Sequence, residues 1–224
     1  MKQWMVYVGI LTSCLLLATS CHFEMNRKTA YVEKVIDGDT IHLTEPVMGT
    51  KKVRLVSVDA PETNYQGQAQ HPWGEKAKNF LMDLLPAGTR IDLEWDQEAK
   101  DRYGRLLAHV WKGDTDVNKE LIRHGHAVTY YIDPNMKYFE EYQSAYLRSK
   151  REGKGMWNPD QPISALPFEF RDQVSGQVQD KYVGNYDTRQ YVPPDQYKSI
   201  PIEKRIFFLK EEDAKKAGYK KMDS

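Results

Sequence analysis

Residues 30–62 read AYVEKVIDGDTIHLTEPVMGTKKVRLVSVDAPE, and this stretch decides the fold. Apolar and β-branched residues fill 30–36 and 40–43, and the turn formers Asp37-Gly38-Asp39 separate the two runs. Such a pattern predicts two strands joined by a tight turn. A third strand is expected over 51–58, because apolar residues recur there until Pro61 stops the run.

Further along the chain, the spacing of apolar residues alternates between the two-residue period of strands and the helical period. Strands are also expected over 90–95 and 105–111, with an extended segment over 127–132. Helical spacing of apolar residues predicts helices over 73–85, from Thr115 or Asp116 to 123, and from Asp133-Pro134 to about 151. About five strands and three helices in one unit predict an α+β, mainly β domain, a small barrel packed on helices.

Carboxylates gather at the ends of the first strands. Asp39 lies in the first turn, Asp59 ends the third strand, and Glu62 follows three residues later. Two carboxylates at strand ends can share one divalent ion, and oxygen ligands suit a hard cation such as Ca²⁺ or Mg²⁺. Glu62 is placed to hold or deprotonate a water molecule. Taken alone, Asp37-Gly38-Asp39 would be only a tight turn; the acids that follow favour a site, with Asp37 structural.

Two arginines accompany these acids. Arg54 begins the run that leads to Asp59, and Arg105 follows Asp101-Arg102-Tyr103-Gly104. Guanidinium forks stabilise the charge that builds on the equatorial oxygens of a phosphorus centre better than lysine does. The alternative for each is an arginine on a strand surface. With the acids, they predict metal-assisted attack of water on a phosphodiester.

The order and spacing of these motifs closely resemble the staphylococcal (thermonuclease-type) nuclease family. The resemblance spans residues 30–158. It implies a five-stranded OB-fold-type barrel packed with three helices. It also implies a Ca²⁺-dependent endonuclease that acts on DNA and RNA and leaves 3′-phosphate ends.

The resemblance assigns roles to individual residues. It implies that Arg54, Glu62 and Arg105 are catalytic. Asp39 and Asp59 would bind Ca²⁺, together with the main-chain carbonyl of Ala60, where the family often has Thr.

The resemblance also suggests how substrate binds. Arg102 and Tyr103 match positions that contact a terminal phosphate, with Arg102 in place of the usual Lys. Tyr130 and Tyr131 can offer a stacking face to a base, and an alignment slip of one residue leaves open which of them does so.

Composition limits how a nucleic acid could be captured. The 224 residues carry a formal net charge of 0, and 29% of them are charged. A whole-molecule basic field is therefore excluded, and positive potential toward DNA or RNA must be local. No obligate protein partner is inferred.

The N-terminus has the pattern of an export signal. Residues 1–20 combine Lys2 with a mostly apolar run, and residues 21–29 form a short tether. Small residues before Cys21 resemble a lipobox, which predicts an exported protein anchored to the outer face of the membrane by a lipid on Cys21. The alternative is an ordinary cleaved signal and secretion. An uncleaved membrane span is disfavoured, because about 20 apolar residues are needed.

The C-terminal part is less informative. Residues 159–181 are polar and contain Pro, Gln and Ser, which predicts a linker. Residues 182–224 form a small module of unknown function, which looks like an Ada-type metal-binding module without its cysteines. After Cys21 the chain has no cysteine, so stability must come from a packed core.

Two other functions compete with a nuclease. One is a nucleic-acid-binding barrel that has lost its catalytic residues. The other is an envelope lipoprotein with a structural role, in which the C-terminal part matters most. The retention of Asp39, Arg54, Asp59, Glu62 and Arg105 favours catalysis over both.

Overall fold

A computed structural model describes residues 27–223 of the chain. The predicted signal peptide at 1–20 and Cys21, with most of the tether, lie outside the described residues. Arg27 to Thr29, the end of the predicted tether, already pair with a strand of the barrel. Among the described residues, no helix has the length and apolar character that a bilayer crossing requires.

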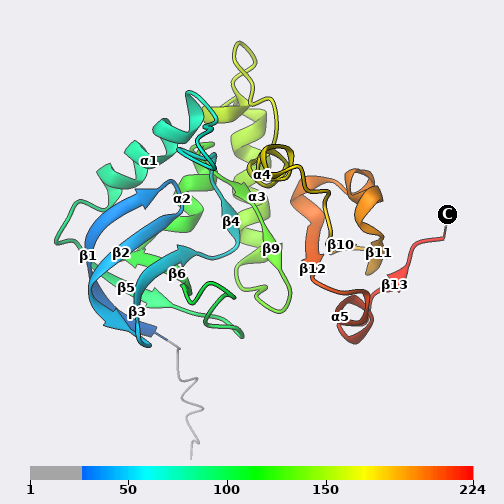
Figure 1. The fold of residues 1–224 in the computed structure, drawn as a ribbon, viewed down its shortest axis with the longest axis horizontal. Coiled ribbons are helices and arrows are strands. Elements are labelled where there is room, and N and C mark those ends of the chain that lie inside the picture. The colour runs from blue at the N-terminus through cyan, green and yellow to red at the C-terminus, as the bar shows by residue number, and fades with distance from the viewer. Residues whose placement is uncertain (1–26, 224) are drawn as a thin grey trace, which may run out of the picture.

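Five strands close into a barrel, as predicted (Figure 1). They are β1 (Arg27–Asp37), β2 (Thr40–Val47), β3 (Thr50–Leu55), β5 (Arg90–Glu94) and β6 (Leu106–Lys112). Their order is β3-β2-β1-β5-β6, and a parallel pairing of β3 with β6 closes the circle. The short strand β7 (Thr115–Asp116) follows β6 in the sequence and pairs with it in antiparallel fashion. Closure gives each of the five barrel strands two neighbours.

Three helices cover the barrel, and their starts follow the local sequence. They are α1 (Trp73–Leu84), α2 (Val117–Arg123) and α3 (Phe139–Arg151). Asp116 caps α2, because its side chain accepts a hydrogen bond from the Lys119 main-chain nitrogen. Helix α3 begins later than predicted. The main-chain nitrogens of Met136 and Lys137 donate to Asp96 at 2.7 and 2.9 Å, which holds residues 133–138 as a loop.

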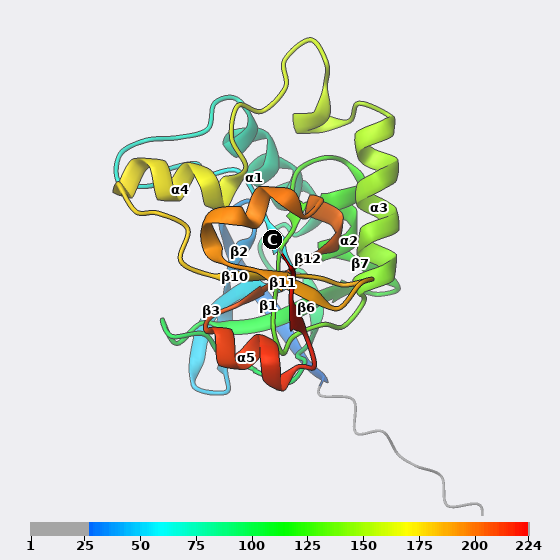
Figure 2. The same cartoon turned by 90° about the vertical axis from the view of Figure 1, so that its right-hand side faces the viewer.

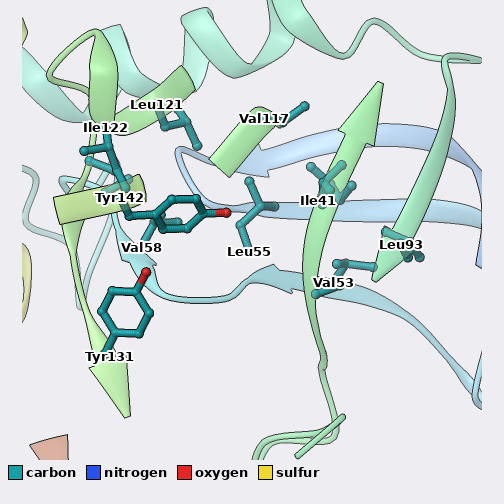
Figure 3. Packing of buried hydrophobic residues seen from close by; sticks show 14 of the residues in the cluster. Ile41, Val53, Leu55, Val58, Leu93, Val117, Leu121, Ile122, Tyr131 and Tyr142 are labelled. Atoms are coloured by element: carbon teal, nitrogen blue, oxygen red, sulfur yellow. The ribbon is translucent and has the colours of Figure 1, made fainter. Parts of the chain in front are cut away.

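The hydrophobic core lies between the barrel and α2. Ile41, Val53, Leu55 and Leu93 point into it from the strands, and Leu121 enters from α2 (Figure 3). All five side chains are completely buried. Apolar residues at alternate strand positions therefore face one core, and the turns at the strand ends remain free to carry polar groups.

A second sheet joins the C-terminal part to the barrel domain. Its order is β13-β11-β10-β12-β9. The strands are β9 (Tyr131–Ile132), β10 (Tyr182–Asn185), β11 (Gln190–Val192), β12 (Arg205–Phe208) and β13 (Lys220–Lys221). Strand β9 belongs to the barrel domain, and β12 pairs with it in parallel. The predicted separate module is therefore continuous with the rest of the molecule.

The segment predicted as a linker also has structure. Residues 159–181 contain α4 (Pro167–Ser175), which lies between the barrel domain and the C-terminal sheet (Figure 1). Seen from the C-terminal side, α4 and α3 stand on the left and right of the C-terminal segment (Figure 2). The prediction of a linker was wrong because Leu166 and Phe168 are buried in a core shared with Val128 and Phe207.

The remaining elements are short. They are β4 (Val58–Asp59), β8 (Val128–Thr129), α5 (Glu211–Lys216) and the 3-10 turns η1 (Gly155–Trp157), η2 (Pro194–Ser199) and η3 (Ile202–Lys204). Strands β4 and β8 form a two-stranded sheet that carries Asp59.

Candidate active site

Backbone geometry brings Asp39 and Asp59 to one end of the barrel. Asp39 sits in the turn between β1 and β2, and its carbonyl accepts a hydrogen bond from the Leu55 nitrogen at 2.9 Å. After β3 the chain turns at Ser57, whose φ of 64° is left-handed, and continues into β4 with Asp59. Asp39 is 8% exposed and Asp59 is fully buried.

The two carboxylates converge on a single nitrogen atom. Nη2 of Arg54 lies 3.0 Å from Oδ2 of Asp39 and donates to Oδ1 of Asp59 at 2.9 Å. Nη1 of Arg54 donates to the Leu55 carbonyl at 2.6 Å, which fixes the guanidinium. Two acidic groups that share one cationic partner are close enough to share a metal ion, so the donor set fits a hard divalent cation.

The main chain of Ala60 lies beside the same carboxylate. Its nitrogen donates to Oδ2 of Asp39 at 2.9 Å. Within residues 27–223 the structure contains no cluster of three or more His, Cys, Asp or Glu side chains suited to a metal. A cation held by Asp39 and Asp59 would therefore need main-chain, water or substrate oxygens to complete its coordination.

Glu62 lies in the loop that follows Pro61. Its main-chain nitrogen donates to Oε1 of Gln70 at 3.1 Å, and its carbonyl accepts from the Gln70 nitrogen at 2.9 Å. The side chain is 14% exposed. Burial raises the pKa of Glu62 to about 7; Arg171 opposes this shift and Asp59 adds to it. A carboxyl whose pKa is near neutral is suited to accept a proton from water.

Arg171 is a site residue that the sequence analysis missed. It lies on α4, and its guanidinium forms a fork on Asp59, with Nη1 to Oδ1 at 3.0 Å and Nη2 to Oδ2 at 2.9 Å. Nη1 also donates to Oε1 of Glu62 at 2.6 Å. The local signals of α4 were present, since Pro167 opens the helix, Glu169 occupies its third position and Gly176 ends it. They predict a helix but not the contacts that it makes.

Arg105 does not join this cluster of ion pairs. Its Nε donates to Oδ2 of Asp101 at 2.7 Å, and its side chain is 29% exposed. In the β3–β6 register Arg54 lies opposite Leu107, two residues after Arg105. Arg105 lies immediately before β6, so this pairing places its main chain near β3, the strand that carries Arg54.

Arg102 and Tyr103 lie on the exposed turn before Arg105. Nη2 of Arg102 donates to the Tyr103 hydroxyl at 2.8 Å, and the Arg102 guanidinium lies 4.9 Å from the ring centroid. Tyr103 is 67% exposed. Both side chains are accessible to a substrate, which their predicted contact with a terminal phosphate requires.

Of the two tyrosines predicted to stack on a base, Tyr131 is buried and Tyr130 is partly exposed. Tyr131 is 1% exposed and packs on Phe139, with ring centroids 4.8 Å apart. Tyr130 stacks on Phe168 of α4, with centroids 5.6 Å apart, and contacts Phe207 at 4.6 Å. Burial among core rings removes Tyr131 as the stacking residue, and Tyr130 packs against two rings of the C-terminal part while its side chain stays partly exposed.

Comparison with known proteins identifies relatives of this chain. A family model described as staphylococcal nuclease homologue matches residues 52–159. The thermonucleases of Staphylococcus hyicus and Staphylococcus intermedius are 35% and 38% identical to this chain. The alignments cover 59% and 60% of this chain, and 78% and 79% of those proteins.

A third relative shares more of the chain. Endonuclease YhcR of Bacillus subtilis (strain 168) is 43% identical over an alignment of 198 residues that covers 85% of this chain. The chain spans only 16% of the length of that protein. An alignment of 198 residues must extend past residue 159, where the family model ends, so the likeness includes part of the C-terminal segment.

The chain covers more than three quarters of two thermonucleases at 35% and 38% identity, and this likeness decides the family. The closed barrel is consistent with it. The chain belongs to the staphylococcal nuclease family of hydrolases.

Proposed function

We propose that the protein is a Ca²⁺-dependent endonuclease that hydrolyses DNA and RNA and leaves 3′-phosphate ends. The convergence of Asp39 and Asp59 on one guanidinium nitrogen supports this proposal, because two carboxylates this close together could share a single divalent cation beside Glu62. The names of the relatives, endonuclease and thermonuclease, support the reaction type.

The residues of the site divide into two roles. Asp39, Asp59 and the main chain of Ala60 would hold the cation. When bound, the cation supplies positive charge to neutralise phosphate oxygens. Oxygen-only side chains at this point suit Ca²⁺ better than zinc.

The reaction itself would use Glu62 and the two predicted arginines. Glu62 accepts a proton from water as the water oxygen forms a bond to phosphorus. Arg54 and Arg105 bind the non-bridging oxygens, where negative charge increases in the transition state. The bond from phosphorus to the 5′ oxygen breaks, and that oxygen takes up a proton, which leaves a 3′-phosphate and a 5′-hydroxyl.

The test is digestion of single-stranded DNA, duplex DNA and RNA with Ca²⁺ or with EGTA, followed by analysis of the product ends. We expect cleavage only with Ca²⁺ and 3′-phosphate on the products. Undiminished cleavage in EGTA would reject the cation requirement, and binding without cleavage would favour a nucleic-acid-binding barrel. Products with 5′-phosphate would contradict the proposed bond breakage.

We also propose that the protein is exported and held at the outer face of the membrane by a lipid on Cys21. The apolar run in residues 1–20 and the small residues before Cys21 support this. Labelling with a radioactive fatty acid, with and without globomycin, tests it. Release of an unlabelled mature protein would show secretion instead.

A further inference from the structure

The carboxylates of the active site are all paired with arginines from two distant parts of the chain. Arg54 of β3 bridges Asp39 and Asp59, and Arg171 of α4 bridges Asp59 and Glu62. Both oxygens of Asp59 are engaged, since Oδ1 accepts from both arginines and Oδ2 accepts from Arg171. Arg171 therefore occupies the place beside Asp59 and Glu62 that suits a cation.

The fold, rather than a flexible surface side chain, places Arg171 there. Phe168 on the same helix stacks on Tyr130, and Glu169 accepts a hydrogen bond from the Tyr197 hydroxyl at 2.6 Å. Nε2 of Gln70 donates to the Ala165 carbonyl at 2.9 Å, just before α4. The same Gln70 accepts from the Glu62 nitrogen, so the loop of Glu62 is joined to the start of the helix.

We propose that Arg171 is a counter-cation of the metal site, which competes with the divalent cation for Asp59 while it also pairs with Glu62. The inference rests on the proposed cation site. A Ca²⁺ ion binds oxygen at about 2.3–2.6 Å and is repelled by a guanidinium on the same carboxylate. Binding of the cation must therefore turn the Arg171 fork away from Asp59.

Arg171 cannot yield its place by losing a proton. The guanidinium of arginine is protonated at every pH at which proteins fold. The guanidinium stays charged and has to move. The C-terminal part thus lowers the affinity of the site for its cation and keeps the acids neutralised until the cation is abundant.

The experiment measures Ca²⁺ binding directly, by calorimetry on the purified chelator-treated protein without nucleic acid. We compare the wild type with Arg171→Gln, Arg171→Lys and the control Gln173→Ala, which changes an exposed residue on the same helix. We expect Arg171→Gln to lower the dissociation constant for Ca²⁺ about 5- to 100-fold, the usual range for coupling between two ligands. The dissociation constant of Arg171→Lys should lie between those of the wild type and Arg171→Gln, because lysine keeps the positive charge but lacks the two-nitrogen fork of the guanidinium.

Thermal unfolding with and without Ca²⁺ gives a second readout. Arg171→Gln should be less stable than the wild type in EDTA and should gain more from Ca²⁺, because the ion replaces the missing charge. If this variant folds only with Ca²⁺, the result supports the proposal. If it fails to fold in both conditions, the Ca²⁺ dissociation constant of Arg171→Lys decides. A value below that of the wild type supports the proposal, and an equal or higher value overturns it.

The outcomes separate this inference from the proposed function. Unchanged or weaker Ca²⁺ binding by Arg171→Gln, alongside normal binding by the wild type, would overturn the inference alone. Absence of Ca²⁺ binding by the wild type and by every variant would overturn the proposed cation site and the inference with it.

Discussion

The ring of Tyr130 stacks on the ring of Phe168, with centroids 5.6 Å apart and planes inclined by 25°. The contact joins the barrel domain to α4 and thereby sets the position of Arg171. Phe168 is 5% exposed and also meets Phe207 at 5.4 Å. The aromatic cluster of Tyr130, Phe168 and Phe207 thus packs the helix that carries Arg171 against the barrel domain.

The first prediction concerns this cluster. Phe168→Ala should lower the free energy of unfolding by about 3 kcal/mol, because it leaves a cavity where a buried ring was. Urea unfolding measures the loss, and limited proteolysis should show faster cleavage within 159–181. Val178→Ala is the control, since Val178 is 81% exposed. A loss no larger than that of the control would show that α4 is held by other contacts.

The second prediction concerns Arg105. Arg105→Gln should reduce turnover about 100- to 1000-fold, the usual cost of removing one donor to a transition-state oxygen. Stability should change little, because its ion pair with Asp101 is partly exposed and such pairs contribute at most about 1 kcal/mol. Steady-state cleavage rates and thermal unfolding test both parts. The exposed Arg151→Gln serves as the control, and wild-type turnover in Arg105→Gln would remove Arg105 from the mechanism.

The third prediction concerns Asp59. Asp59→Asn should destabilise the cation-free protein by about 3 kcal/mol, because Arg54 and Arg171 would lose a buried charged partner. It should also abolish Ca²⁺ binding in calorimetry. The exposed Asp114→Asn gives the comparison. Retention of wild-type Ca²⁺ affinity in Asp59→Asn would place the cation elsewhere.

The fourth prediction concerns pH and His109. Nδ1 of His109 lies 2.8 Å from the Tyr142 hydroxyl, which itself donates to Oδ1 of Asp116 at 3.1 Å. Burial lowers the pKa of His109 to about 3 from an ordinary value of 6.5. The unfolded chain takes up this proton below pH 6.5 and the folded chain does not, so the free energy of unfolding falls as pH drops from 6.5 toward 3.

His109→Gln removes this titration and keeps a polar group of similar reach. Between pH 7 and pH 5 the wild type should lose on the order of 2 kcal/mol more than His109→Gln. Urea unfolding at the two pH values measures the difference. His71→Gln changes an exposed histidine and should behave as the wild type. Equal losses in the wild type and His109→Gln would assign the pH dependence to other groups.

Much of the barrel domain could be predicted from the sequence, because its signals are local. Alternating apolar residues and the turn at Asp37-Gly38-Asp39 specify the first hairpin over a few residues. Asp116 followed by an apolar run predicts the start of α2, and the structure confirms the cap. The start of α3 could not be read in this way, because Asp96, about 40 residues earlier, holds the preceding loop.

The same distinction between local and long-range signals applies to the candidate site. The sequence by itself determined the fold class and a short list of acids and arginines, since the relevant residues lie at strand ends and in turns with recognisable local patterns. Only the tertiary structure decided that Tyr130 stacks on Phe168 and that Arg171 reaches Asp59 and Glu62. Arg171 is 112 residues from Asp59 and 109 from Glu62. Contacts at such separations depend on how whole elements pack, and the residues around α4 reveal only that a helix forms there.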